Sequence, residues 1–167
     1  MLFAIVTRPA GAQNGDYTLN AGDSIRIYVY GEPDLTFEKL LVGPNGRIPY
    51  PFLGEITAKG KTAGEIQHLL VSGLRPEYLI DPRIAVSIVE YRPFFVNGEV
   101  EKPGAVAFQP GLTLRKAISL ASGFTERANR KDILVINDSD AGLKERKVGL
   151  DYRVQPGDII TVKDTFF

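Results

Sequence analysis

The stretch Phe94–Pro110, FFVNGEVEKPGAVAFQP, constrains the fold more than any other part of the chain. It opens with three apolar residues suited to a buried strand. Asn97-Gly98 then favours a tight turn, because both residues tolerate a positive φ. Pro103-Gly104 indicates a second turn, after which apolar residues alternate again. We therefore expect a hairpin that begins a second module and sets how two modules of the chain sit together.

The residues before this stretch predict an αβ module. Alternation of apolar with polar and tyrosine residues over 25–30 indicates a half-buried strand. Prolines within 47–56 favour an edge strand, because each one removes a ladder donor. Thr62 and Glu65 match a capping box, and we expect a helix to follow it. Another strand is expected over 83–91. The helix should bury one apolar stripe, formed by Ile66, Leu69, Leu70 and Leu74.

The residues after this stretch predict a second αβ module. Thr113 is expected to cap a helix and Gly123 to stop it at the C′ position. Residues 133–136 indicate a short buried strand, 144–148 a solvated strand and 159–162 a final strand. Seventeen Gly and eleven Pro agree with many short strands and turns.

The predicted fold class is α+β, built from two small modules at 16–92 and 93–167. A chain of 167 residues that is 44% hydrophobic is long enough for this arrangement. Residues 1–15 are set apart. The apolar run Leu2–Val6 and the small residues Ala10-Gly11-Ala12 favour a signal-peptide remnant, and the alternatives are a disordered N-terminus or a stray strand. No apolar run has the length of a membrane-spanning helix.

Composition and motifs argue against an enzyme. Lys plus Arg and Asp plus Glu total 20 each, so no bulk charge draws the protein to nucleic acid. The chain has no Cys, and its single His68 allows neither a Cys-His pair nor a multi-histidine zinc site. No serine lies in a nucleophile elbow, and no glycine-rich phosphate loop is present. We expect no metal or cofactor. The basic residues Arg115, Arg127, Arg130 and Lys131 indicate a solvated face, an anionic-polymer contact or an acidic-partner contact.

One short echo connects the two halves of the chain. Gly22-Asp23 and Gly157-Asp158 each place a turn immediately before a strand. Gly-Asp is common turn chemistry, and the halves do not otherwise align, so the echo alone does not indicate a duplicated domain.

The motifs, taken in order, resemble the polysaccharide export family of Gram-negative outer-membrane proteins (Wza-type). The first module resembles its export-signature domain through Tyr17-x-Leu19-x-x-Gly22-Asp23-x-Ile25-x-Ile27, Pro33-x-Leu35, Val42-x-Pro44-Asn45-Gly46-x-Ile48, Pro51-x-Leu53-Gly54-Glu55-Ile56, Gly60-x-Thr62-x-x-Glu65 and Leu79-x-x-Pro82. The second resembles the soluble-ligand-binding β-grasp (SLBB) domain through Val96-x-Gly98-Glu99-Val100-x-x-Pro103-Gly104, Leu112-Thr113-Leu114-x-x-Ala117-Ile118-x-x-Ala121-x-Gly123 and Pro156-Gly157-Asp158-x-Ile160-x-Val162. Together these motifs cover residues 16–162.

The resemblance implies a component of capsular or extracellular polysaccharide export. Larger members stack such modules as rings around a polymer passage and receive the polymer from an inner-membrane copolymerase. We therefore expect a homo-oligomer in the periplasm, associated with the outer membrane, that performs no bond chemistry. The alternative is a binding module whose β-grasp half holds a soluble sugar.

Three departures from the larger members qualify this picture. The lipid-attachment cysteine, a second β-grasp module and a C-terminal amphipathic helix are not found in the sequence. We expect the chain to work with a separate outer-membrane channel or as a periplasmic collar.

Site residues follow from the same reading. Four tyrosines on expected strands are candidates for stacking on sugar faces, with strand packing as the alternative: Tyr28, Tyr30, Tyr50 and Tyr91. Nine motif residues are expected to shape the backbone and not to bind ligand: Gly22, Asp23, Gly46, Gly54, Gly98, Pro103, Gly104, Gly157 and Asp158.

Overall fold

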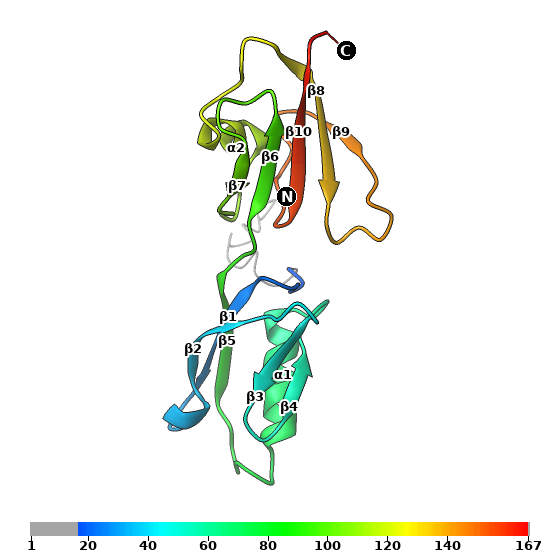
Figure 1. The fold of residues 1–167 in the computed structure, drawn as a ribbon. Helices are drawn as coiled ribbons and strands as arrows, with labels where there is room; N and C mark the ends of the chain where they lie inside the picture. The colour runs from blue at the N-terminus through cyan, green and yellow to red at the C-terminus, as the bar shows by residue number, and fades with distance from the viewer. Residues whose placement is uncertain (1–16, 167) are drawn as a thin grey trace, which may run out of the picture.

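Two separate hydrophobic cores divide the chain. The computed structural model describes residues 17–166. The first core takes its fully buried side chains from between Leu19 and Ile84. The second takes them from between Phe94 and Val162, and the two sets share no member. Each core belongs to its own module, and the modules lie end to end in an elongated molecule (Figure 1). Helices and mainly antiparallel sheets occur in both halves, which confirms the α+β class.

The first module wraps a helix and a hairpin around a three-stranded sheet. The sheet has the order β2-β1-β5 and is antiparallel throughout, while β3 and β4 form a separate two-stranded sheet. Helix α1 packs against β5. The elements are β1 (Ser24–Val29), the 3₁₀ turn η1 (Pro33–Leu35), β2 (Phe37–Leu41), β3 (Arg47–Tyr50), β4 (Gly54–Thr57), α1 (Ala63–Leu74) and β5 (Ile84–Glu90).

Local sequence explains most of these elements. In β1 the apolar residues are buried and Tyr28 faces outward, as the alternation predicts. The capping box at the start of α1 is confirmed. The Glu65 amide donates to Thr62 Oγ1 (3.2 Å), and the Thr62 amide donates to the Glu65 carboxylate (2.8 Å). Pro49 lies in β3. Because β3 and β4 form a two-stranded sheet, both are edge strands, and the missing N–H of Pro49 is tolerated there.

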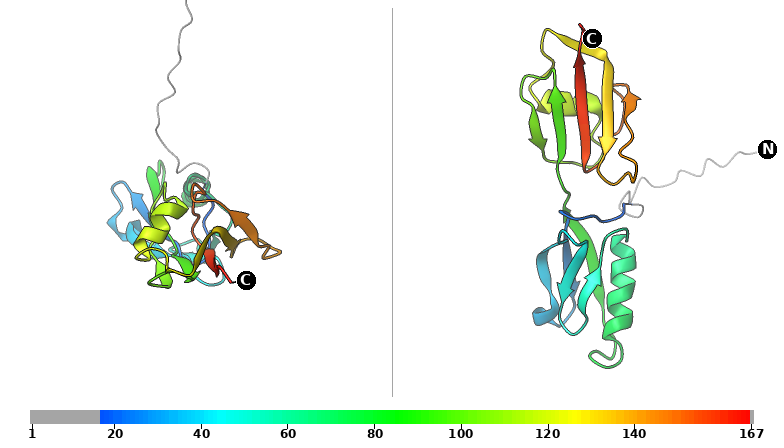
Figure 2. Two further views of the ribbon diagram at one scale, coloured as in Figure 1. Left: turned by 90° about the horizontal axis from the view of Figure 1, so that it is seen from above. Right: turned by 45° about the vertical axis from the view of Figure 1, so that its right-hand side comes forward.

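The second module is a five-stranded sheet with one short helix. The sheet order is β7-β6-β10-β8-β9; β6 and β10 are parallel and the other pairs antiparallel. Helix α2 lies across one face of this sheet (Figure 2, right). The elements are β6 (Phe94–Gly98), β7 (Gly104–Val106), α2 (Leu114–Leu120), β8 (Ala128–Asn137), β9 (Arg146–Val148) and β10 (Asp158–Asp164).

The structure corrects the expected turn at Asn97-Gly98. Both residues lie in β6, where they pair with Thr161 and Val162 of β10. The hairpin does form, but its turn lies in residues 99–103. Gly98 has φ +80°, and a Cβ there would overlap the Val162 carbonyl, so the glycine allows close strand approach and not a two-residue turn.

Other differences concern element ends. Strand β8 runs from 128 to 137, well beyond the expected 133–136, because it pairs with β10 over residues 133–137 and, after a register shift, again at Ala128. Thr113 is the N-cap of α2, but its side chain makes no capping hydrogen bond. Ser122 occupies C′ with φ +66°, and Gly123 follows it. The amides of Ser122 and Gly123 donate to the carbonyls of Ser119 and Ile118, which is a Schellman ending.

Two expectations concern the membrane and the N-terminus. Within residues 17–166, no helix has both the length and the apolar character needed to cross a bilayer. The signal-peptide interpretation of residues 1–15 lies outside the described residues.

Candidate functional site

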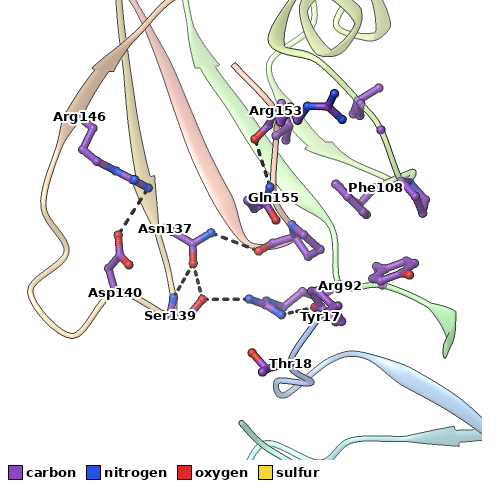
Figure 3. A pocket seen from close by; sticks show the side chains of 16 residues that line it. Tyr17, Thr18, Arg92, Phe108, Asn137, Ser139, Asp140, Arg146, Arg153 and Gln155 are labelled. Atoms are coloured by element: carbon purple, nitrogen blue, oxygen red, sulfur yellow. Dashed lines mark hydrogen bonds and ion pairs between the residues drawn. The ribbon is translucent and has the colours of Figure 1, made fainter. Parts of the chain in front are cut away.

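A cleft of about 570 Å³ lies where the two modules meet. Residues at the start of the first module and at the link between the modules form one side of it. The segment 108–112, the end of β8 with the residues after it, and the segment 153–156 form the rest (Figure 3). Its volume falls in the range of small-ligand sites.

A buried carboxylate organises the first-module side. Asp23 is fully buried. Its Oδ2 accepts from the Tyr17 hydroxyl and from the Asn20 amide, both at 2.8 Å. Its Oδ1 accepts from the Arg92 backbone amide, also at 2.8 Å. We call residues 17–23 the first Tyr–Asp turn. It satisfies the carboxylate and fixes the point where the chain leaves the module.

The second module repeats this arrangement. Asp158 is also fully buried, and its Oδ2 accepts from the Tyr152 hydroxyl (3.0 Å) and the Gln155 amide (2.7 Å). In both turns the tyrosine lies six residues before the aspartate and the amide donor three residues before it. We call residues 152–158 the second Tyr–Asp turn. The Gly-Asp echo is thus part of a longer repeat of one local structure.

Burial and the buried carboxylates shift the pKa values in both turns. Burial, followed by the hydrogen bond to Asp23, raises the pKa of Tyr17 well above its ordinary value. Burial, followed by the charge of Asp158, does the same for the pKa of Tyr152. Both hydroxyls therefore stay protonated and act as donors at neutral pH. Burial also raises the pKa of Asp158, against the opposing effect of its hydrogen bonds from Asn137, Gln155 and Tyr152.

Arg92 connects the two modules. Its side chain is only 8% exposed. Nη1 donates to the Tyr17 hydroxyl (2.7 Å) and lies 3.4 Å from Asp23 Oδ2. On the other side Nη2 donates to Asp138 Oδ1 (3.1 Å) and to Ser139 Oγ (3.2 Å). One buried guanidinium thus joins the first Tyr–Asp turn to the residues that follow β8 (Figure 3).

Backbone hydrogen bonds within the second module hold the residues that meet Arg92. The Gly157 amide donates to the Pro93 carbonyl (3.1 Å), and the Asp138 amide donates to the Gly157 carbonyl (3.2 Å). Gly157 has φ +79°, and a Cβ there would overlap the Asp138 carboxylate. The glycine therefore leaves the space in which Asp138 meets Arg92.

Aromatic rings line the cleft beside this joint. Tyr17 and Tyr91 meet edge to face with centroids 5.0 Å apart, and Tyr91 and Phe108 do the same at 5.2 Å. Tyr91 belongs to the first module and Phe108 to the second. The row of rings therefore spans the boundary and gives the cleft an apolar surface.

Polar side chains complete the cleft. Arg146 pairs with Asp140 at 3.7 Å. Gln155 is exposed, and its Nε2 donates to the Arg153 carbonyl (3.3 Å). The Arg153 side chain is exposed and has no carboxylate within 4.0 Å among residues 17–166. Rings, amides and guanidinium groups are suited to recognising a ligand by stacking and hydrogen bonds.

The candidate tyrosines lie in three different places. Tyr91 lines the cleft. Tyr28 and Tyr30 lie together on the outer face of β1 and beyond its end, 36% and 61% exposed, with their rings edge to face at 4.8 Å. Tyr50 is a correction. It is 3% exposed, its hydroxyl donates to the Leu35 carbonyl (2.8 Å), and burial raises its pKa to about 12. Tyr50 is a core residue and offers no face to a sugar.

The motif glycines occupy the backbone region that glycine favours. Positive φ values occur at Gly22, Gly46, Gly54, Gly98, Gly104 and Gly157. Asp23 and Asp158, grouped with them as backbone-shaping positions, are the buried acceptors of the two Tyr–Asp turns. Pro103 is exposed in the turn before β7.

Sequence reasoning missed the residues that make the joint. From the sequence, neither Arg92 nor Asp138 is assigned a role in a site. A signal for the Tyr–Asp turns was present, because a tyrosine precedes each Gly-Asp at the same spacing. Within residues 17–166 no group of three or more His, Cys, Asp or Glu side chains is arranged to hold a metal ion.

Two family models match the chain in succession. One is described as polysaccharide biosynthesis/export protein and matches residues 11–89. The other is the SLBB domain and matches residues 93–148. The gap between the two matches contains Tyr91 and Arg92, at the joint between the modules.

Curated relatives align with half to three quarters of the chain. The exopolysaccharide production protein ExoF of Rhizobium meliloti is 36% identical over 92 residues, which are 53% of this chain and 21% of ExoF. The polysialic acid transport protein KpsD of Escherichia coli is 30% identical over 126 residues, 73% of this chain and 22% of KpsD. The EPS I polysaccharide export outer membrane protein EpsA of Ralstonia nicotianae is 26% identical over 140 residues, 69% of this chain and 36% of EpsA. The chain thus spans between 21% and 36% of the length of these relatives.

Proposed function

Because the chain belongs to the polysaccharide biosynthesis/export family, we propose that it is a component of the machinery that exports capsular or extracellular polysaccharide. It acts in the periplasm, associated with the outer membrane. The observation that carries this proposal is the succession of an export domain and an SLBB domain. Relatives named for polysaccharide transport or export align with about 70% of the chain. We take the functional modules to be 16–92 and 93–167.

The role we propose is structural, without bond chemistry. The export family is a transport family and not a class of enzymes. The buried Arg92 joint supports a role as a rigid wall element, because it holds two modules in one orientation. Stacked modules held in this way are suited to line a passage for a polymer.

We further propose that several copies assemble into a ring. Large apolar side chains remain exposed on both modules and are available for contacts between copies. They include Leu41, Phe52, Tyr78, Ile80, Val89, Phe95 and Leu120. An inner-membrane copolymerase would deliver the polymer, and a separate outer-membrane channel would complete the path.

Gene deletion in the native host tests the export role. Loss of export should reduce surface and secreted polysaccharide while polymer accumulates inside the cell, and a plasmid copy of the gene should restore secretion. A strain that makes no polymer at all would indicate a role in synthesis. Unchanged secretion in a host with no second copy of the gene would contradict the proposal.

Light scattering on the purified chain tests the ring separately. We expect a mass corresponding to several copies, rising with protein concentration. A monomer at every concentration would contradict self-assembly of this chain and leave the export role to be decided by the deletion.

A second candidate function is a soluble sugar-binding module. The cleft between the modules favours it, because rings and hydrogen-bonding side chains meet there. Calorimetric titration with oligosaccharides separates the two functions. Tight, saturable binding favours a binding module, whereas weak binding fits a conduit that must release its cargo.

A further inference from the structure

Two aromatic rings form a corner on the cleft wall. Tyr91 and Phe108 are half-buried and meet at an interplanar angle of 69°. Burial in the joint holds both rings, since Tyr91 also packs against Tyr17. Each ring keeps part of its surface open to the cleft. Such rings present an apolar face against which the C–H groups of a sugar ring can pack.

The charges around the cleft are paired, with one exception. Asp140 pairs with Arg146, while Asp23 and Asp138 pair with Arg92. Arg153 alone among the cleft-lining arginines lacks a carboxylate within 4.0 Å in the described part of the chain. Figure 3 shows Arg153 and Phe108 toward one side of the cleft, with Asp140 and Arg146 toward the other.

We propose that the cleft between the modules binds a carboxylated sugar unit, with its ring against Tyr91 and Phe108 and its carboxylate on the Arg153 guanidinium. The guanidinium fork matches a carboxylate with two parallel charge-assisted hydrogen bonds, whereas a neutral sugar offers only uncharged acceptors, which bind the fork more weakly. Exposed Gln155 offers an amide to the sugar hydroxyls. The proposal rests on the export function for its choice of polysaccharide as the ligand.

A single guanidinium without a carboxylate partner among residues 17–166 favours a ligand with one negative charge per sugar residue. Of the other two cleft arginines, Arg92 pairs with Asp23 and Asp138, and Arg146 pairs with Asp140. Because Arg153 is exposed, water and salt weaken the contact, so we expect binding on the order of 0.1–1 mM, in the range that lets a conduit release its polymer.

An NMR titration of the full chain at low ionic strength tests the site. The acidic probes are a tetrasaccharide of alternating glucuronic acid and N-acetylglucosamine, and a short oligosialic acid. A tetrasaccharide of N-acetylglucosamine is the neutral probe. We expect at least one acidic probe to shift the signals of Tyr91, Phe108 and Arg153 and to bind about tenfold more tightly than the neutral one. The comparison between acidic probes distinguishes a uronate from a sialate.

Substitution of Arg153→Gln gives the second measurement. This variant should bind the preferred acidic probe about tenfold more weakly and the neutral probe unchanged. Arg83→Gln is the matched control, because Arg83 is exposed in the first module, outside the cleft, and the substitution removes the same charge. Its affinity should equal that of the wild type.

Several results would overturn the site. Equal affinity for acidic and neutral probes would show that the carboxylate does not contribute to binding. Equal weakening of binding by both variants would show that only the net charge of the protein matters. Signals that shift outside the cleft place the sugar elsewhere. If Arg153→Gln changes the mass of the assembly but not the affinity for sugar, the cleft is a contact between copies and not a sugar site. If no probe binds, the sugar site is wrong, and the gene deletion still decides the export function. If a probe binds but the deletion causes no export defect, the export function is wrong and the sugar site remains.

Discussion

At the scale of single residues, the molecule depends on three buried charges. Asp23, Asp158 and Arg92 are each less than 10% exposed, and each has several hydrogen-bond partners. A buried charge is tolerated only when its partners replace water. The tyrosines of the two Tyr–Asp turns serve this purpose, which gives a physical reason for their fixed spacing from each aspartate.

Removing the guanidinium should destabilise the protein. Arg92→Met leaves Asp23 buried with only its neutral donors, at a cost of roughly 2–3 kcal/mol in the free energy of unfolding. Urea denaturation measures the change. Arg83→Met, at an exposed position, should stay within about 0.5 kcal/mol of wild type. Equal stability of the Arg92 variant would show that Asp23 does not need the cation.

Protonation of Asp158 should contribute to the pH dependence of the free energy of unfolding. Its pKa is raised in the folded protein, so the folded state binds more protons than the unfolded state between the two pKa values. Stability from this group is therefore present below about pH 4 and is lost as the pH rises toward the raised pKa. Asp158→Asn should flatten that fall in melting temperature. An unchanged pH profile in the variant would contradict the assignment.

At the scale of elements, close backbone approach decides where strands pair. The parallel pairing of β6 with β10 brings Gly98 against the Val162 carbonyl. Because of this contact, Asn97 and Gly98 form the end of β6 and not the two-residue turn that the sequence predicts. In β8, similarly, pairing with β10 extended a strand that local apolar content had marked as short.

Two glycine substitutions separate strain from contact. Gly31 and Gly98 have nearly the same φ, +81° and +80°, but a Cβ at Gly31 meets nothing within 4 Å. Gly31→Ala should cost only the backbone strain, about 1 kcal/mol. Gly98→Ala should cost distinctly more, because the methyl group forces β6 away from β10. Urea denaturation of both variants checks this, and equal losses would mean that the strand contact relaxes freely.

At the scale of the whole molecule, the side chain of Arg92 contacts residues of both modules. Arg92 leaves the end of the first module and ends among the residues after β8. The hydrogen bond from Gly157 to Pro93 ties the first residue of the second module to its own sheet, and Arg92 reaches across from the first module at this point.

Loosening this joint should free the modules without unfolding them. Asp138→Ala removes the carboxylate partner of Arg92 Nη2 and Nε and leaves Ser139 Oγ as the remaining second-module partner; Asp138 is half-exposed, so stability should change little. Relaxation and residual dipolar coupling measurements should then show independent tumbling of the modules. Asp140→Ala is the control, since Asp140 is equally exposed but pairs only within the second module. Rigid tumbling in both variants would show that the contacts remaining without Asp138 are enough to hold the modules together.

The sequence by itself determined the local elements and the family. Short-range patterns can be recognised without a structure. Examples are the alternation in β1, the capping box of α1 and the order of the motifs that contain Gly and Pro. Only the tertiary structure decided which residues meet across the chain. Arg92 and Asp138 are 46 residues apart, and nothing local distinguishes them from surface charges. Tyr50 and Tyr28 both lie on strands, but only packing of the whole module shows that Tyr50 is inside. The cleft likewise exists only where the two folded modules meet, because its rings and guanidinium groups come from distant segments that no local pattern connects.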